Sequence, residues 1–126
     1  CGHSLGGAVA TLYAYSIKKH YPHYNVSATT IGSPRVGNKV FKDNYDNSGI
    51  DTLRIVHNND LVTHTPYIRF YHVNHQVRLD NNGNRLKNDK SLKSFWLYLK
   101  ALFSGKTVKD HMGDGYINAL ENWVKK

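Results

Sequence analysis

A serine between two glycines opens the chain and carries its strongest chemical signal. Ser4 lies in the pattern Gly2-His3-Ser4-Leu5-Gly6, and small residues that favour a helix packed closely on a sheet follow at once. Such a pattern is typical of a sharp strand-to-helix turn that exposes a serine hydroxyl as a nucleophile. Glycine is expected at Gly2 and Gly6 because the turn crowds the backbone on either side of the serine. An ordinary glycine-rich turn is the alternative.

A serine hydroxyl becomes an effective nucleophile when a histidine accepts its proton and a carboxylate orients that histidine. Asp60 follows a predicted strand over 52–56, and the carboxyl ends of such strands carry the functional loops of open α/β sheets. His111 lies in a polar, glycine-containing loop between the last two predicted helices. The order Ser4, Asp60, His111 is the order of a hydrolase triad on an α/β sheet.

Other histidines and aspartates compete for these roles. His64 is the main alternative base because it lies four residues after Asp60, but its closeness to Pro66 favours a packing or hydrogen-bonding role. Asp110 is a poorer acid than Asp60, because its side chain is expected to point away from the adjacent His111. We expect Asp110 to be a solvent-facing turn residue.

The oxyanion of an acyl-transfer reaction needs two donors. The backbone N–H of Leu5, the residue after the serine, is expected to be one, and the other comes from an earlier strand-to-helix loop that this chain does not contain. Only Cys1 stands where the strand entering the turn is expected. We therefore expect residues 1–126 to be the C-terminal part of a single domain that is truncated at the serine turn. When isolated, this part is expected to be poorly folded and nearly inactive.

Periodicity and breakers predict alternating helices and strands. The connection between strands 26–31 and 52–56 has helix length, which indicates a parallel pair. Residues 80–84 form a predicted turn, after which the chain returns at 85–86. A further strand is expected over 71–79. Helices are expected over 5–20 and over 92–103, a short helix after a cap at Asn38, and a last helix over 116–126 after a cap at Asp114.

Composition narrows the class of protein. With 40% hydrophobic and 21% charged residues the sequence is that of a globular protein, and it has no apolar run long enough to span a membrane. A single cysteine excludes an internal disulfide, and no Cys/His cluster has zinc spacing. The net charge of +8 is concentrated in the last third. Such a field suits an anionic lipid surface, although scattered lysines usually form a solvated face; no nucleic-acid partner is expected.

Four segments, in order, resemble the class 3 lipases, the family of the fungal triacylglycerol lipases. They are residues 2–8, residues 32–38, residues 54–62 with Pro66, and Asp110-His111. The resemblance implies an α/β-hydrolase fold, no metal or other cofactor, and hydrolysis of acylglycerols or other ester lipids with transient contact to a lipid surface. It also implies that Ser4 is the nucleophile, Asp60 the orienting acid and His111 the base.

The sequence departs from the family pattern twice. Tyr67 follows Pro66 where the family often has paired prolines, and four residues separate His111 from Tyr116 where the family's tyrosine follows closely. Phospholipase A1 and feruloyl-type esterases share the same triad and remain alternatives. A non-catalytic lipase-like module that binds a membrane or a protein partner is the alternative from another functional class.

Overall fold

The structure, a computed structural model, describes residues 1–87 and 107–126. The predicted helix over 92–103 lies outside the described residues. The chain forms two compact units, which are described separately. The first unit comprises Cys1–Ile55 and Val62–Gln76, and the second comprises Val56–Leu61 and Val77–Lys126.

Four strands form a sheet in the order β1 (Gly2–His3), β2 (Ser27–Ile31), β3 (Asp51–His57) and β4 (His75–Leu79). β2 is parallel to both β1 and β3, with Thr29 opposite Leu53. The predicted parallel pair is confirmed. Since parallel strands end at a common edge of a sheet, the residues that follow β1 and β2 emerge on the same side.

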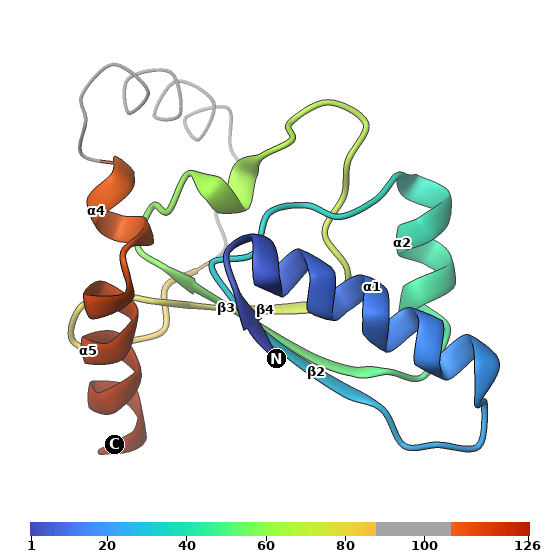
Figure 1. Ribbon diagram of the computed structural model, residues 1–126. Helices are drawn as coiled ribbons and strands as arrows, with labels where there is room; N and C mark the ends of the chain where they lie inside the picture. Colours follow the sequence, from blue (N-terminus) through green and yellow to red (C-terminus); the bar gives the residue numbers. More distant parts are fainter. Residues whose placement is uncertain (88–106) are drawn as a thin grey trace. The chain divides into compact units, whose positions relative to one another are not determined.

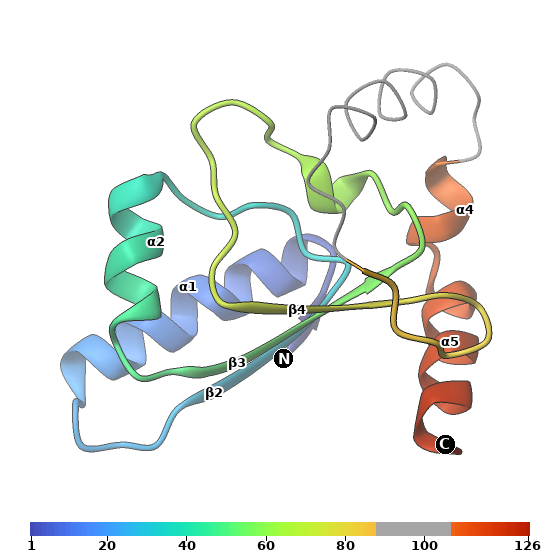
Figure 2. The same ribbon diagram turned by 180° about the vertical axis from the view of Figure 1, so that it is seen from behind.

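Helix α1 (Leu5–His20) has the predicted bounds and packs on β1 and β2. Figures 1 and 2 show it lying across one face of these strands. Helix α2 (Lys39–Asp46) begins after Asn38, whose side chain accepts a hydrogen bond from the Phe41 N–H at 2.9 Å. The expected cap is therefore present, and it satisfies one of the unpaired donors of the first turn. Among the described residues, no helix is long and apolar enough to cross a membrane.

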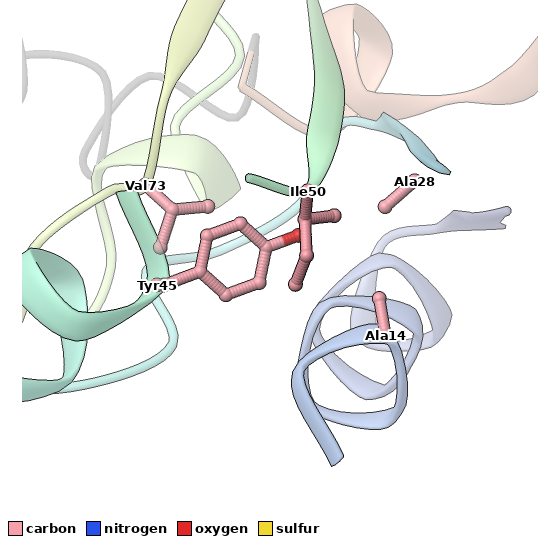
Figure 3. Close-up of a cluster of buried hydrophobic side chains, with 5 residues drawn as sticks. All are labelled: Ala14, Ala28, Tyr45, Ile50 and Val73. Carbon is pink, nitrogen blue, oxygen red and sulfur yellow. The ribbon is translucent and has the colours of Figure 1, made fainter. Parts of the chain in front are cut away.

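The core of the first unit is built around Tyr45, whose side chain is completely buried. Figure 3 shows its ring among side chains from α1, β2 and the segments that precede β3 and β4, namely Ala14, Ala28, Ile50 and Val73. Its hydroxyl lies 2.8 Å from Thr52 Oγ1, so the polar end of the ring is paired inside the core. This cluster joins both helices to the sheet that carries the serine turn.

β4 is shorter than predicted. The strand expected over 71–79 begins at His75, and Tyr71 forms only an isolated bridge to Gly37. Asn74 breaks the strand because it has a positive φ of 42° and its N–H donates to Asp46 Oδ1 at 2.8 Å. After β4, the predicted return is confirmed by a bridge between Leu79 and Arg85.

The C-terminal helices also differ from prediction. Helix α5 (Gly113–Val124) begins three residues early and is preceded by Met112, so Asp114 lies in its first turn and is not a cap. Helix α4 (Thr107–His111) occupies part of the predicted loop, and His111 is its last residue. A 3₁₀ turn, η1 (Val62–His64), lies between β3 and β4.

Crowding in the connection between β1 and α1 requires glycine at one of the two positions around Ser4, namely Gly2. A Cβ at Gly2 would lie 2.2 Å from the backbone oxygen of Gly6, whereas a Cβ at Gly6 would meet nothing within 4 Å. The expectation that Gly6 is crowded is therefore wrong. The second crowded position is Gly7, where a Cβ would lie 2.7 Å from Ser33 Cβ, because α1 crosses close to the loop after β2.

We expect Gly2→Ala to lower the free energy of unfolding by about 3 kcal/mol, since the backbone atoms it meets have no room to move. Gly6→Ala is the matched control, with an effect within about 1 kcal/mol because alanine is the better helix former. Denaturant unfolding of the two variants measures the difference. Equal destabilisation by both would contradict the crowding at Gly2.

Candidate active site

Ser4 occupies a strained turn between β1 and α1. Its backbone has φ 56° and ψ −129°, a region that a non-glycine residue enters at a cost of about 1–3 kcal/mol. The turn is held from both sides, because the Ser4 N–H donates to Ile31 O at 2.9 Å and its carbonyl accepts from the Gly7 N–H at 2.9 Å. The geometry is that of a sharp strand-to-helix turn, as the glycine pattern predicts.

Leu5 is the first residue of α1. Helix geometry gives the N–H groups of a first turn no carbonyl within the helix, and their dipoles make this end positive. No acidic residue lies in the first turn of α1 to neutralise that field. The Leu5 N–H thus lies in a locally positive environment next to Ser4.

In the second unit, Asp60 is completely buried and lies against His111. Its Oδ2 atom is 2.8 Å from His111 Nδ1, and the His111 side chain is only 16% exposed. Because a carboxylate accepts, Nδ1 carries the hydrogen, and Nε2 of the neutral ring is left to take up a proton. A buried acid and a histidine held in this tautomer are what nucleophilic catalysis requires.

Tyr116 is a second donor to Asp60 that the sequence analysis did not identify. Its hydroxyl donates to Asp60 Oδ2 at 2.6 Å. Burial, followed by the negative charge of Asp60, raises the pKa of the Tyr116 hydroxyl far above its usual value, so the donor stays protonated. The four residues after His111 place Tyr116 in the first turn of α5, from which it reaches back to the acid. The sequence signal for this contact is Tyr116 itself, which follows His111 after four intervening residues where the family's tyrosine follows closely.

His57 and Asp110 support this pair. The two ring nitrogens of His57 lie 3.1 Å from the Asp110 carbonyl oxygen and 2.6 Å from Asn81 Oδ1. Asp110 Oδ2 accepts from the Asn59 N–H at 3.4 Å. The expectation of a turn at Asp110 is wrong, because Asp110 lies in α4. Its half-exposed side chain connects this helix to the loop that carries Asp60.

The structure brings two of the three predicted catalytic residues into contact, namely Asp60 and His111. Ser4 belongs to the first unit, as does the alternative base His64, which ends η1. Within the described residues, no group of three or more His, Cys, Asp or Glu side chains has the arrangement of a metal site.

Residues 1–70 match the family model of lipase (class 3), which is more than half of the chain. The chain belongs to the class 3 lipase family. Its sequence is 44% identical over 66 residues to phospholipase A(1) DAD1, chloroplastic, of Arabidopsis thaliana, covering 52% of this chain and 15% of that protein. It is 43% identical over 68 residues to a lipase of Rhizopus niveus, covering 52% of this chain and 17% of that lipase.

Solved lipases share the fold. The Rhizomucor miehei triacylglyceride lipase aligns with a TM-score of 0.67 and 25% identity, over 87% of this chain and 44% of that one. Lipase II from Rhizopus niveus aligns with a TM-score of 0.55 and 36% identity, over 62% of this chain and 31% of that one. The fold is therefore that of the α/β-hydrolase lipases, and the chain spans less than half the length of these relatives.

In this class 3 lipase we expect Tyr116→Phe to lower the free energy of unfolding by about 2 kcal/mol, since it removes a donor from a buried charged acceptor. Denaturant unfolding of the wild type and the variant measures this difference. Tyr13→Phe, at an exposed tyrosine of α1, is the control; equal effects of the two substitutions would contradict the role of the Tyr116 hydroxyl.

Proposed function

We propose that this protein hydrolyses carboxylic ester bonds of acylglycerols through Ser4, His111 and Asp60. The observation that carries the proposal is the buried contact of Asp60 with His111, 2.8 Å between Oδ2 and Nδ1. The strained turn at Ser4 and membership of the class 3 lipase family support it. No cofactor takes part.

In the proposed reaction, Ser4 Oγ attacks the ester carbonyl carbon while Nε2 of His111 accepts the hydroxyl proton. The Leu5 N–H donates to the oxyanion, with a second donor from outside residues 1–126. The intermediate collapses, the bond to the alcohol breaks, and His111 returns the proton to the leaving oxygen. Water then repeats the sequence on the acyl-enzyme and releases the fatty acid.

Asp60 acts through His111. Its ionised carboxylate holds the histidine in the tautomer with hydrogen on Nδ1 and stabilises the charge that appears on the ring in each half-reaction. Tyr116 is a positioning residue, because its hydroxyl donates to the acid at 2.6 Å and acts on the histidine through that acid.

We also propose that both units belong to one lipase domain, supported by an alignment to a single lipase that covers 87% of this chain. A phospholipase A1 activity is the second candidate, favoured by the 44% identity to a phospholipase A(1) of Arabidopsis thaliana. Release of fatty acid from triacylglycerol against release from phosphatidylcholine separates the two substrates.

The nucleophile is tested by labelling. We expect a fluorophosphonate probe to modify the full-length protein at Ser4, and Ser4→Ala to abolish the modification. Peptide mass spectrometry identifies the modified residue. Undiminished labelling of Ser4→Ala would contradict the assignment, and an unlabelled wild-type protein would favour the non-catalytic module.

The base is tested by a pair of histidine substitutions. We expect His111→Ala to lower kcat/KM on p-nitrophenyl butyrate by at least about a thousandfold, since the serine loses its proton acceptor. His64→Ala should retain most of the activity. Loss of turnover in His64→Ala together with survival in His111→Ala would make His64 the base.

A further inference from the structure

The ring of His57, the last residue of β3, is buried in the second unit against α4 and the turn after β4. Only 2% of this residue is exposed. Its Nδ1 atom lies 3.1 Å from the Asp110 carbonyl oxygen in α4, and its Nε2 atom lies 2.6 Å from Asn81 Oδ1 in the turn. In Figures 1 and 2 that turn, in yellow, passes beside α5. The ring therefore links the strand that leads to Asp60 with the helix that ends at His111.

The contact with Asp110 decides which ring nitrogen of His57 carries hydrogen. A carbonyl oxygen only accepts, so Nδ1 donates to it. The Asn81 side chain is an amide, which can present either its oxygen or its nitrogen to Nε2, and Asn58 Nδ2 lies 3.1 Å from the same ring atom. In the neutral ring, Nδ1 is thus the donor and Nε2 the acceptor.

The Asp110 carbonyl belongs to the peptide that joins Asp110 to His111. That peptide is planar, so a bond that holds its oxygen also constrains the N–H and the Cα of His111. Helix α4 has only five residues, and the last four carbonyls of a helix have no N–H partner within it. His57 supplies such a partner, and it thereby constrains the direction in which the His111 side chain leaves the backbone.

The segment that follows His111 also lies against the His57 ring. A Cβ at Gly115 would lie 2.7 Å from His57 Cε1, so the first turn of α5 is in direct contact with this ring. The centre of the Tyr116 ring is 5.4 Å from that of the His57 ring. His57 therefore contacts the chain on both sides of His111, at residue 110 and at residues 115 and 116.

We propose that His57 is a positioning residue for the reaction, which holds the segment from Asp110 to Tyr116 so that His111 Nδ1 meets the Asp60 carboxylate. Its Nδ1–H bond orients the peptide before His111, and its ring keeps α5 at the spacing from which Tyr116 reaches the same carboxylate. The proposal rests on the proposed function in one respect, that His111 is the base. A ring that only fills space is the alternative, and in that case the identity of its nitrogens would not matter.

Two amide substitutions separate the two nitrogens of His57. The side-chain nitrogen of asparagine can take the place of Nδ1 and that of glutamine the place of Nε2, so His57→Asn keeps a donor for the Asp110 carbonyl and His57→Gln does not. Both substitutions remove the ring, so a difference between them reports the bond and not the packing. His75→Gln, at the exposed histidine that begins β4, is the control.

The rate at which a fluorophosphonate probe labels Ser4 in the full-length protein measures removal of the serine proton, and the final labelled fraction measures the folded protein. We expect His57→Gln to lower the rate about a hundredfold, the effect of a misplacement of about 1 Å, without lowering the final fraction. His57→Asn should keep the rate within about fivefold of wild type. Equal rates for His57→Gln and wild type, or equal losses in the two amide variants, would overturn the proposal.

A second pair of variants tests the ring without removing it, and it decides the matter where His57→Gln does not fold. The Cβ of Gly115→Ala would press on the His57 ring, whereas a Cβ at Gly113 would meet nothing within 4 Å. Alanine is the better helix former at both positions, so a difference between the two variants comes from the ring. We expect Gly115→Ala to slow labelling about tenfold and Gly113→Ala to match wild type. Equal rates for both would overturn the role of the ring.

The placement of His111 can also be followed without turnover, through its Nδ1–H resonance in full-length protein that carries ¹⁵N-labelled histidine. His111→Ala assigns this resonance by removing it. We expect the resonance in wild type and in His57→Asn, and its loss through exchange with solvent in His57→Gln. That pattern in a protein that is not labelled at Ser4 would support the positioning role and contradict the esterase. Labelling at Ser4, with a resonance that does not depend on His57, would do the reverse.

Discussion

The second unit depends on how the carboxylate of Asp60 is satisfied inside the protein. A buried charge without partners costs several kcal/mol, and here the Oδ2 atom receives hydrogens from His111 Nδ1 and the Tyr116 hydroxyl. His111 is the last residue of α4, and Tyr116 lies in the first turn of α5. Both contacts therefore depend on where α4 ends and where α5 begins. The same contacts that stabilise the acid also select the tautomer of His111, which joins the stability of this unit to its chemistry.

Helix α5, which carries Tyr116, is held by the turn that follows β4. Gly83 has φ +71°, and a Cβ there would lie 2.4 Å from the backbone nitrogen of Trp123, so this turn lies directly against α5. Asn122 Nδ2 donates to Asn81 O at 3.0 Å, and the guanidinium of Arg85 lies 5.3 Å from the centre of the Trp123 ring. These contacts fix the end of α5 opposite to the one that carries Tyr116.

In the first unit, the strained backbone of Ser4 is likewise stabilised by hydrogen bonds to its neighbours. The unfavourable backbone of Ser4 is held by hydrogen bonds to β2 and to α1, while Arg35 and Arg54 organise the segment that leads to β4. Arg54 is buried and donates to Val73 O at 3.2 Å and Gln76 Oε1 at 3.0 Å; burial lowers its pKa to about 10, so it remains a cation. The neutral acceptors Val73 O and Gln76 Oε1 thus stabilise a buried charge, and their hydrogen bonds hold the chain where β4 begins.

Local sequence patterns determined much of this protein. The bounds of α1, the cap at Asn38, the parallel pair of β2 and β3, and the serine turn follow from helix periodicity, breakers and glycine spacing, which act over a few residues. The contact of Asp60 with His111 was predicted from chain order, and the two residues are brought together from positions 51 apart.

Tertiary contacts decided the rest. β4 is short because the Asn74 N–H pairs with distant Asp46, and Gly6 proved open while Gly7 is crowded by Ser33. Tyr116 became a partner of the acid, and Asp110 became part of its support, only because helix α5 starts early and α4 replaces a loop. Such features depend on which groups meet after the chain has folded, and spacing along the sequence does not contain that information.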